Sequence, residues 1–181
     1  MSMNTVLRIT KADLDADGQY IGATDVSQEF DGSIEIDADL GVVKFKASVR
    51  VKFQIFALAG SGIEAGLGIK AGEGIKAGSG IEAGSGIEAG WGIEAGWGIK
   101  AGWGIKAGSG IEAGEGIEAG SGIEAGWGIV GKWISSGLRI FAGLCNWRIP
   151  TAEEMQIRAE LRGGVIAFGE HVPPGSGTLH D

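Results

Sequence analysis

A six-residue phrase, x-G-I-[E/K]-A-G, repeats eleven times without interruption from Ser61 to Gly126, and it constrains the fold more than any other feature of the chain. A helix would lose roughly 1 kcal/mol per glycine relative to alanine, or about 20 kcal/mol over the block. Collagen-like packing needs a glycine at every third position, whereas these glycines alternate between four and two residues apart. The phrase therefore predicts a short strand, Ile-[Glu/Lys]-Ala, between glycine corners.

Side chains alternate between the two faces of a strand, so Ile63 and Ala65 should face a core and Glu64 should face water. The glycines are expected to supply the positive φ angles that a sharp corner needs. One phrase buries a single Ile, worth about 2 kcal/mol, while ordering its residues costs about 1 to 2 kcal/mol each. No phrase can fold alone, so the phrases must stack about 4.8 Å apart as an all-β solenoid.

The section of this solenoid is either three-sided or flattened to two sides. Three-sided stacking places Glu64 under Glu82, Lys70 under Glu88 and Lys76 under Glu94, and pairs most neighbouring charges oppositely. Two-sided stacking does so equally well, and exposed pairs are worth under about 1 kcal/mol each, so charge does not decide. We expect three sides, because a triangular section holds three Ile side chains per coil without a void. The handedness stays open.

Composition limits the function classes. A formal net charge of −8 argues against direct nucleic-acid binding, which normally requires a basic face. A single cysteine, Cys145, excludes an internal disulfide. The first ten residues lack a basic and then apolar signal sequence, and no apolar run approaches 18 residues, so we expect a cytoplasmic protein with no membrane contact.

The flanks of the repeat divide the chain into further segments. Residues 1–31 are an N-terminal entry segment, 32–60 are irregular first coils with period-two patterning, 61–132 are the repeat solenoid, 133–172 are a C-terminal cap, and 173–181 are a disordered tail. Phe45 and Phe53 are expected to fill wider first coils. The run from Lys44 to Lys52 is basic, and we interpret it as a solvated face, with an acidic partner as the alternative.

Two flanking motifs allow more than one interpretation. Asp13, Asp15, Asp17 and Gly18 match the opening of a calcium loop, but Thr24 stands where a bidentate Glu is needed, so an acidic surface turn and no bound metal is expected. In the cap, alternation over 155–162 followed by two glycines predicts a hairpin with 165–168. A helix is the alternative, because Thr151 and Glu154 have capping-box spacing.

The first position of the phrase varies most, and it holds Trp91, Trp97 and Trp103 in three successive phrases. Because Ser and Glu occupy the same position elsewhere, it should point to solvent at the corners. Aromatic side chains are enriched at interfaces, so these residues, with Trp127 and Trp133 further on, are either partner anchors or lids that lie flat over bare glycine backbone.

The G-I-[E/K]-A-G phrases and the exit at 138–144 resemble β-helical proteins of bacteria and phages that carry bactofilin-like or polymer-forming labels. The resemblance covers about two thirds of the chain. It implies a solenoid, with self-association as an expectation, and it implies no activity. The chain is less similar to the left-handed hexapeptide acyltransferases, because a small residue normally stands in them where Trp or Glu stands here, and they use a histidine near the solenoid, whereas His171 and His180 lie near the C-terminus.

No catalytic triad, zinc-ligand spacing or phosphate loop is present, so we expect neither an enzyme nor a cofactor. Two function classes remain. The first is a non-catalytic scaffold that binds a protein partner through corner Trp and charged ladders. The alternative is a phage-borne acidic inhibitor, such as an anti-CRISPR or another anti-defence protein, whose Glu ladders mimic nucleic acid in a host nucleic-acid-binding complex. The candidate partner-binding residues are Trp91, Trp97, Trp103, Trp127, Glu82, Glu88, Glu94, Glu112 and Glu118.

Overall fold

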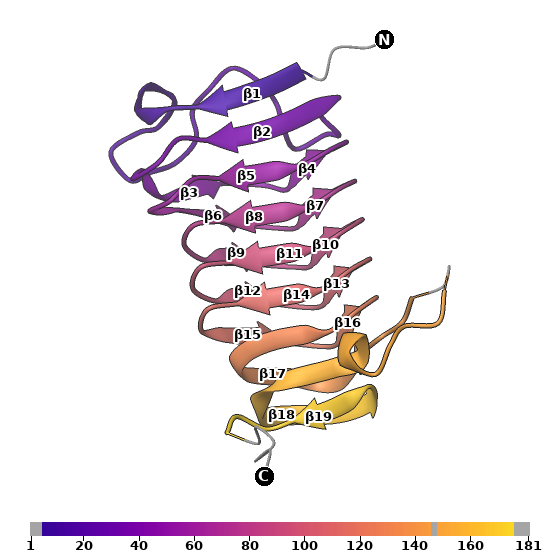
Figure 1. Cartoon of the computed structure of the whole chain (residues 1–181). Helices are drawn as coiled ribbons and strands as arrows, with labels where there is room; N and C mark the ends of the chain where they lie inside the picture. Colours follow the sequence, from indigo (N-terminus) through magenta and orange to yellow (C-terminus); the bar gives the residue numbers. More distant parts are fainter. Residues whose placement is uncertain (1–4, 146–147, 176–181) are drawn as a thin grey trace.

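The computed structural model describes residues 5–145 and 148–175, and in it the chain winds into a rod of stacked parallel strands (Figure 1). From β2 to β14, each strand pairs in parallel with the strand three further along the chain, so each coil has three sides. The described residues contain two short 3₁₀ turns, η1 (Lys11–Asp13) and η2 (Glu153–Met155), and no α-helix. The predicted three-sided all-β solenoid is therefore the observed fold.

The strands of the regular coils form three faces, which we number in chain order. The first face consists of β3 (Gly41–Phe45), β6 (Ser61–Ala65), β9 (Ile81–Ala83), β12 (Ile99–Ala101) and β15 (Gly116–Ala119). The second face consists of β4 (Val49–Val51), β7 (Ile69–Ala71), β10 (Ile87–Ala89), β13 (Ile105–Ala107) and β16 (Ile123–Ala125). The third face consists of β1 (Thr5–Ile9), β2 (Gly32–Ile36), β5 (Ile55–Ala57), β8 (Ile75–Ala77), β11 (Ile93–Ala95) and β14 (Ile111–Ala113).

The core follows from an exact register. Ile63 pairs with Ile81, and Ile81 with Ile99, so equivalent residues of neighbouring coils are 18 positions apart. The repeat Ile side chains are at most 1% exposed and the repeat Ala side chains at most 4%. Most repeat Ile residues therefore stack on Ile above and below, while Ile63 and Ile69 stack on Val43 and Val49 of the preceding coil. The interior of the repeat block is a column of Ile and Ala, as the alternation predicts.

The glycine corners work differently from our expectation. Among the described residues, positive φ occurs at Gly18, Gly41, Gly60, Gly143, Gly164, Gly169, Gly175 and Asp39, none of which lies in the repeat block. The expected use of positive φ in the repeat is therefore wrong. The last glycine of a phrase is needed for close approach instead, because a Cβ on Gly90 would overlap the Gly72 carbonyl oxygen of the previous coil. The second position is less crowded, since a Cβ on Gly92 would lie 3.4 Å from the nearest atom, the Gly110 oxygen.

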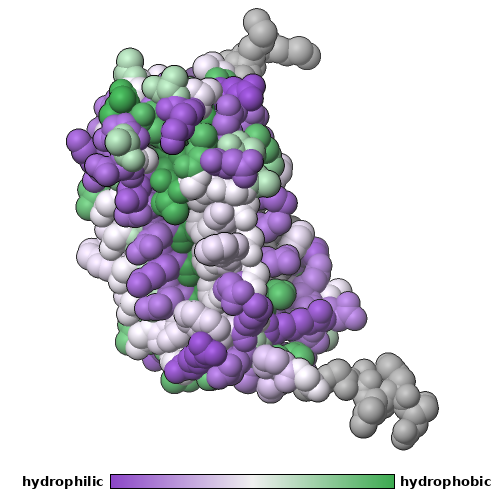
Figure 2. Space-filling model, turned by 90° about the vertical axis from the view of Figure 1, so that its left-hand side faces the viewer, coloured by the Kyte–Doolittle hydropathy of each residue, from purple (hydrophilic) through white to green (hydrophobic). Residues whose placement is uncertain are grey.

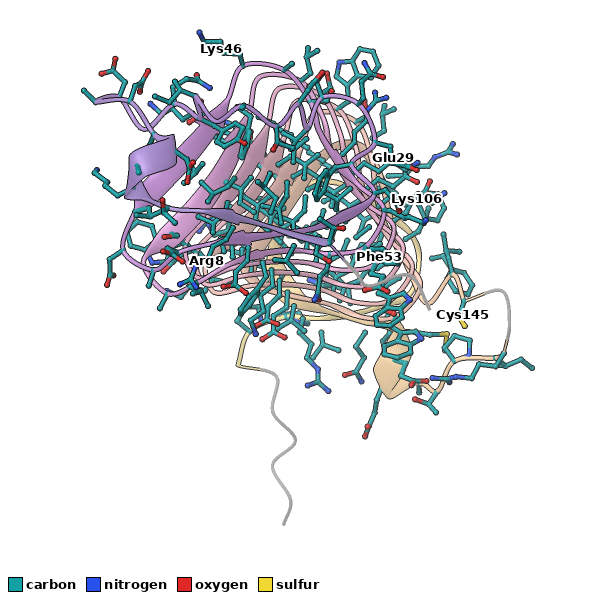
Figure 3. The ribbon with its side chains drawn as sticks, turned by 90° about the horizontal axis from the view of Figure 1, so that it is seen from above. Arg8, Glu29, Lys46, Phe53, Lys106 and Cys145 are labelled. Atoms are coloured by element: carbon teal, nitrogen blue, oxygen red, sulfur yellow. The ribbon has the colours of Figure 1, made fainter. Side chains whose placement is uncertain are left out.

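The first coils are wider than the repeat coils. Val49 pairs with Ile69, 20 positions later, and Ile34 pairs with Ile55, 21 positions later. Phe45 fills part of the added space as expected, since it is buried and its ring centroid lies 5.3 Å from that of Tyr20. The same expectation for Phe53 is wrong, because its side chain is only partly buried and does not belong to the core. Viewed along the axis, the interior is filled with side chains while Lys46 and Lys106 lie at the periphery (Figure 3).

The C-terminal segment continues the solenoid, so the predicted hairpin and its helical alternative are both wrong. β17 (Ile129–Ala142) turns across all three faces beneath β14, β15 and β16. β18 (Gln156–Phe168) then runs parallel to β17, and β19 (Glu170–Val172) runs parallel to the start of β18. The physical reason is an unpaired edge on β17 together with the Ile157–Ala159 segment, in which both apolar residues are fully buried.

Thr151 and Glu154 do exchange the hydrogen bonds of a capping box, at 2.9 and 3.4 Å, but the segment forms a single turn, η2, which includes Glu154. No helix in the described part of the chain is long and apolar enough to cross a membrane. Residues 176–181 of the predicted disordered tail lie outside the described residues.

Candidate interaction site

Three tryptophans stand exposed on the corners of the rod. Trp91, Trp97 and Trp103 are 62, 68 and 70% exposed. Their backbone N–H groups donate to three different corner residues of the preceding coil, at 3.1, 3.2 and 2.9 Å, namely Glu73, Ser79 and Ser85. The three side chains therefore occupy three successive corners of one coil and form a ring around the rod, not a single flat patch.

Trp133 is a lid, unlike the three ring residues. Its ring occupies the space next to Gly116 that a Cβ would take. The guanidinium of Arg162, a residue of β18, lies 4.9 Å from the centroid of that ring. The lid interpretation of the tryptophans thus applies to Trp133. Trp133 covers glycine backbone, and the three ring residues are left in solvent.

Trp127, one of the candidate partner-binding residues, is partly covered. Arg148 lies 5.6 Å from its ring centroid, and Glu154 accepts two hydrogen bonds from Arg148, at 2.7 and 2.5 Å. These bonds, with one from the Thr151 backbone, lower the pKa of Glu154 to about 2. Among the described residues, the buried indole Nε1 of Trp127 has no hydrogen-bond partner. Trp127 is thus less available to a partner than the ring residues.

The outward Glu and Lys side chains form one ladder on each face, in the register expected for three sides. Ion pairs join Lys70 to Glu88 at 3.3 Å, Lys76 to Glu94 at 2.7 Å and Lys106 to Glu124 at 3.6 Å. All six side chains are more than two-fifths exposed, so each pair contributes under about 1 kcal/mol. The charged ladders therefore contribute little to the stability of the rod.

The candidate carboxylates do not converge. Glu82 and Glu118 lie on the first face, Glu88 on the second, and Glu94 and Glu112 on the third. Within the repeat block, two glutamates occupy consecutive coils only at Glu64–Glu82 and Glu94–Glu112. The nine candidate residues therefore surround the rod and do not make one continuous surface.

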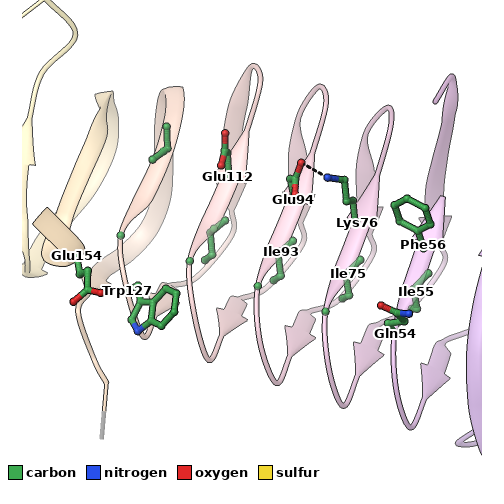
Figure 4. Close-up of a pocket in the computed structure, with 16 residues that line it drawn as sticks. Gln54, Ile55, Phe56, Ile75, Lys76, Ile93, Glu94, Glu112, Trp127 and Glu154 are labelled. Atoms are coloured by element: carbon green, nitrogen blue, oxygen red, sulfur yellow. Dashed lines mark ion pairs between the residues drawn. The ribbon is translucent and has the colours of Figure 1, made fainter. Parts of the chain in front are cut away.

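A groove runs along each face beside its ladder, a feature that our sequence analysis missed. The groove on the third face has a volume of about 680 Å³ and extends from Gln54 and Phe56 to Trp127 and Glu154 (Figure 4). The second-face groove, of about 630 Å³, includes Trp103. The first-face groove, of about 310 Å³, ends at Val42 and Trp133. The signal for these grooves is the glycine before each Ile, which leaves the floor without side chains.

The surface agrees with this arrangement. Figure 2 shows the side of the rod that lies on the left in Figure 1, where rows of hydrophilic side chains run along the rod and a narrow hydrophobic seam lies between them and paler residues. The basic run of 44–52 spans a corner, from Lys44 on β3 to Arg50 on β4, and Lys52 pairs with Asp31 at 2.7 Å. It is therefore spread over two faces.

Two of the three aspartates of the calcium-like motif, Asp13 and Asp15, accept hydrogen bonds within the local turn. Asp13 accepts hydrogen bonds from the backbone and hydroxyl of Thr10, at 2.8 and 2.9 Å, which lower its pKa. Asp15 accepts from the backbone of Asp17 and Gln19, at 3.0 and 2.9 Å. Within the described residues, no group of three or more His, Cys, Asp or Glu side chains is arranged to hold a metal ion.

The remaining candidate chemistry is sparse. A His171 ring nitrogen on β19 lies 2.9 Å from the Ala159 carbonyl oxygen, and His180 lies outside the described residues. Cys145 follows β17, in the segment that leaves the rod (Figure 3).

Comparison with family models, with curated proteins and with solved structures finds no match to this chain. The class that the fold defines is a β-solenoid repeat protein with coils of 18 residues in its regular part. The bactofilin-like resemblance is supported by none of these comparisons and stays a prediction.

Proposed function

We propose that this chain is a non-catalytic scaffold that binds a protein partner through the ring of Trp91, Trp97 and Trp103, with the charged ladders setting orientation. The observation that carries the proposal is the exposure of three bulky aromatic side chains, 62 to 70%, at one level of the rod. Buried aromatic anchors supply a large share of binding energy at protein interfaces. An unused ring of three would expose apolar surface at a cost in solubility.

The ring is not needed for the fold. The backbone of Trp97 donates to Ser79, and the backbone of Ser79 donates to Ser61, at 3.2 and 2.9 Å. Ser and Trp therefore make the same corner at the same position of the phrase. This equivalence supports a role for the indole rings in binding.

The ring geometry also describes the partner. One flat surface reaches at most two corners of a three-sided rod, so a partner that uses all three tryptophans must surround the rod. An enclosing partner should lose affinity with each single Trp→Ser substitution, whereas a partner on one side should be insensitive to at least one of them.

The test compares the wild-type chain with the Trp91→Ser, Trp97→Ser and Trp103→Ser triple variant in quantitative affinity purification from the source cells. Leu67→Ser is the matched control, because Leu67 is a 53% exposed apolar side chain at the same phrase position outside the ring. We expect the triple variant to keep the wild-type melting temperature and to lose a specific partner that the Leu67→Ser variant retains. Retention by the triple variant would show that the ring is not the binding site.

The acidic-inhibitor hypothesis has less support. Mimicry of phosphates by a ladder requires consecutive carboxylates, and within the repeat block no face places more than two glutamates on consecutive coils. Competition with DNA or RNA that weakens steeply as salt rises would favour that hypothesis over the tryptophan ring.

A further inference from the structure

In the groove of the first face, one aromatic ring of the chain itself lies where the ring of a ligand would lie. At its lower end the Trp133 ring lies over Gly116, and the Arg162 guanidinium lies 4.9 Å from that ring. Gly116 is buried as a result, whereas Gly98 and Gly80, the equivalent residues one and two coils above, remain partly exposed on the groove floor. One aromatic ring of the chain thus lies over the glycine of one coil, and the equivalent glycines of the next two coils are left uncovered.

The open steps repeat the backbone of the occupied one. Ile99 pairs with Ile117, and Ile81 with Ile99, in an uninterrupted register. A planar ring over Gly98 or Gly80 therefore meets the same peptide surface that Trp133 meets over Gly116. From Gly80 to Gly116, the glycines that line the groove, there are two coil steps, or about 10 Å at about 4.8 Å per step.

The wall of this groove selects for positive charge. The ladder beside the floor carries three carboxylates and one ammonium group, those of Glu64, Glu82, Glu118 and Lys100. Among the described residues, none of these four side chains has an ion partner within 4.0 Å. Glu115, on the opposite wall, is already paired with Lys132 at 2.5 Å. The unpaired carboxylates Glu64 and Glu82 occupy neighbouring coils at the upper end.

The other two grooves offer less to a cation. The second-face ladder contains Arg50, Lys70 and Lys106, and both of its glutamates are paired with lysines. On the third face, Lys76 occupies Glu94 at 2.7 Å, which leaves Glu112 as the unpaired carboxylate of the ladder.

We propose that the first-face groove is a binding site for an elongated, planar, aromatic small-molecule cation. The aromatic part lies flat over Gly98 and Gly80 next to Trp133, and the positive end lies between Glu82 and Glu64, whose outer neighbours in the ladder are Lys100 and Lys44. This site is independent of the proposed function, because Trp91, Trp97 and Trp103 do not line the groove.

The probe is thioflavin T, an elongated planar aromatic cation, titrated by fluorescence against the full chain at low salt. Gly80→Leu fills the floor, and its Cβ is tolerated because the nearest atom, the Gly98 oxygen, lies 3.4 Å away. Gly86→Leu is the matched control, which places the same side chain at the equivalent step of the second face with a nearest contact of 3.3 Å. We expect Gly80→Leu to weaken binding at least about tenfold, and Gly86→Leu to change it less than about twofold.

A second pair of substitutions tests the charge without touching the floor. Glu64→Gln with Glu82→Gln should weaken dye binding about three- to tenfold at low salt, because two unpaired carboxylates are lost. The Trp91, Trp97 and Trp103 triple Ser variant should bind the dye as the wild type does. Absence of saturable binding, equal weakening by Gly86→Leu, or unchanged affinity in the double Gln variant would each refute the proposal. If Gly80→Leu does not fold, the double Gln variant decides the question.

Discussion

The two glycines of each phrase look alike in sequence, yet the structure predicts opposite outcomes when each is replaced by alanine. A Cβ on Gly90 would overlap the Gly72 carbonyl oxygen, while a Cβ on Gly92 would lie 3.4 Å from the Gly110 oxygen. Neither residue has a positive φ, so backbone strain does not separate them. The comparison therefore isolates the effect of close approach between coils.

The expected magnitudes differ by several kcal/mol. Overpacking costs about 1 to 3 kcal/mol, and pushing the coils apart weakens the Gly90 N–H to Ala71 bond of 3.1 Å, worth about 0.5 to 1.5 kcal/mol. Gly90→Ala should thus destabilise by about 2 to 4 kcal/mol, or lower the melting temperature by about 4 to 16 °C. In Gly92→Ala, the reduced freedom of the unfolded chain, worth about 0.4 to 1 kcal/mol, offsets the snug contact, so stability should change by less than about 1 kcal/mol.

The assay is urea and thermal unfolding of both variants, followed by circular dichroism. Gly108→Ala and Gly110→Ala, one coil further along, give an independent pair with the same geometry, since a Cβ on Gly108 overlaps the Gly90 oxygen and one on Gly110 lies 3.3 Å from its nearest atom. Equal stability within either pair would refute the assignment of the last glycine to close approach between coils.

Three further predictions test the core, the turn at Asp13–Gly18 and the contact between Arg148 and Glu154. Ile93→Asp should destabilise by about 4 kcal/mol or more in urea unfolding, because Ile93 is 1% exposed and the charge would be buried between Ile75 and Ile111; an unchanged melting temperature would contradict the core. Millimolar calcium should raise the melting temperature no more than magnesium does, because the Asp13 and Asp15 carboxylates accept hydrogen bonds within the turn. The pKa of Glu154 is lowered from 4.5 to about 2, so its carboxylate stays ionised and paired with Arg148 above pH 4.5, and the pair is lost as the pH falls towards 2. A carboxyl NMR titration should therefore show a higher midpoint for Glu154 in the Arg148→Gln variant than in the wild type.

Much of the fold could be predicted because the same pattern, a short strand with Ile and Ala on one side and a charged residue on the other, occurs eleven times. The position of Ile63 under Ile81, and the outward direction of Glu64 from β6, follow from period-two alternation and the need to stack. The role of the corner glycines could not be predicted, because an absent Cβ serves positive φ and close approach equally well in a sequence. Only the neighbouring coil, which supplies the clashing oxygen, distinguishes them.

The C-terminal coils were missed, and the lid could not be assigned to a particular tryptophan, for a related reason. Ile140–Ala142 and Ile157–Ala159 retain the Ile-x-Ala pattern, but irregular spacers separate them, so the 18-residue spacing that identifies the repeat is lost. Trp133 and Trp97 are both aromatic residues near a corner. They differ because Trp133 stands in register with Gly116 and turns its ring over that residue, which is a contact between coils.

The phrase also limits where function can reside. Ile, Ala and the last glycine of the phrase are fixed by the core and by close approach between coils. The first position, the glycine at the second position and the charged residue are therefore the positions free to vary. A feature repeated every 18 residues forms a row along the rod, as the charged ladders and the groove floors do. A feature repeated every six residues forms a ring, as Trp91, Trp97 and Trp103 do. The spacing of a substitution pattern therefore determines whether a ligand lies along this rod or surrounds it, and this chain carries both patterns.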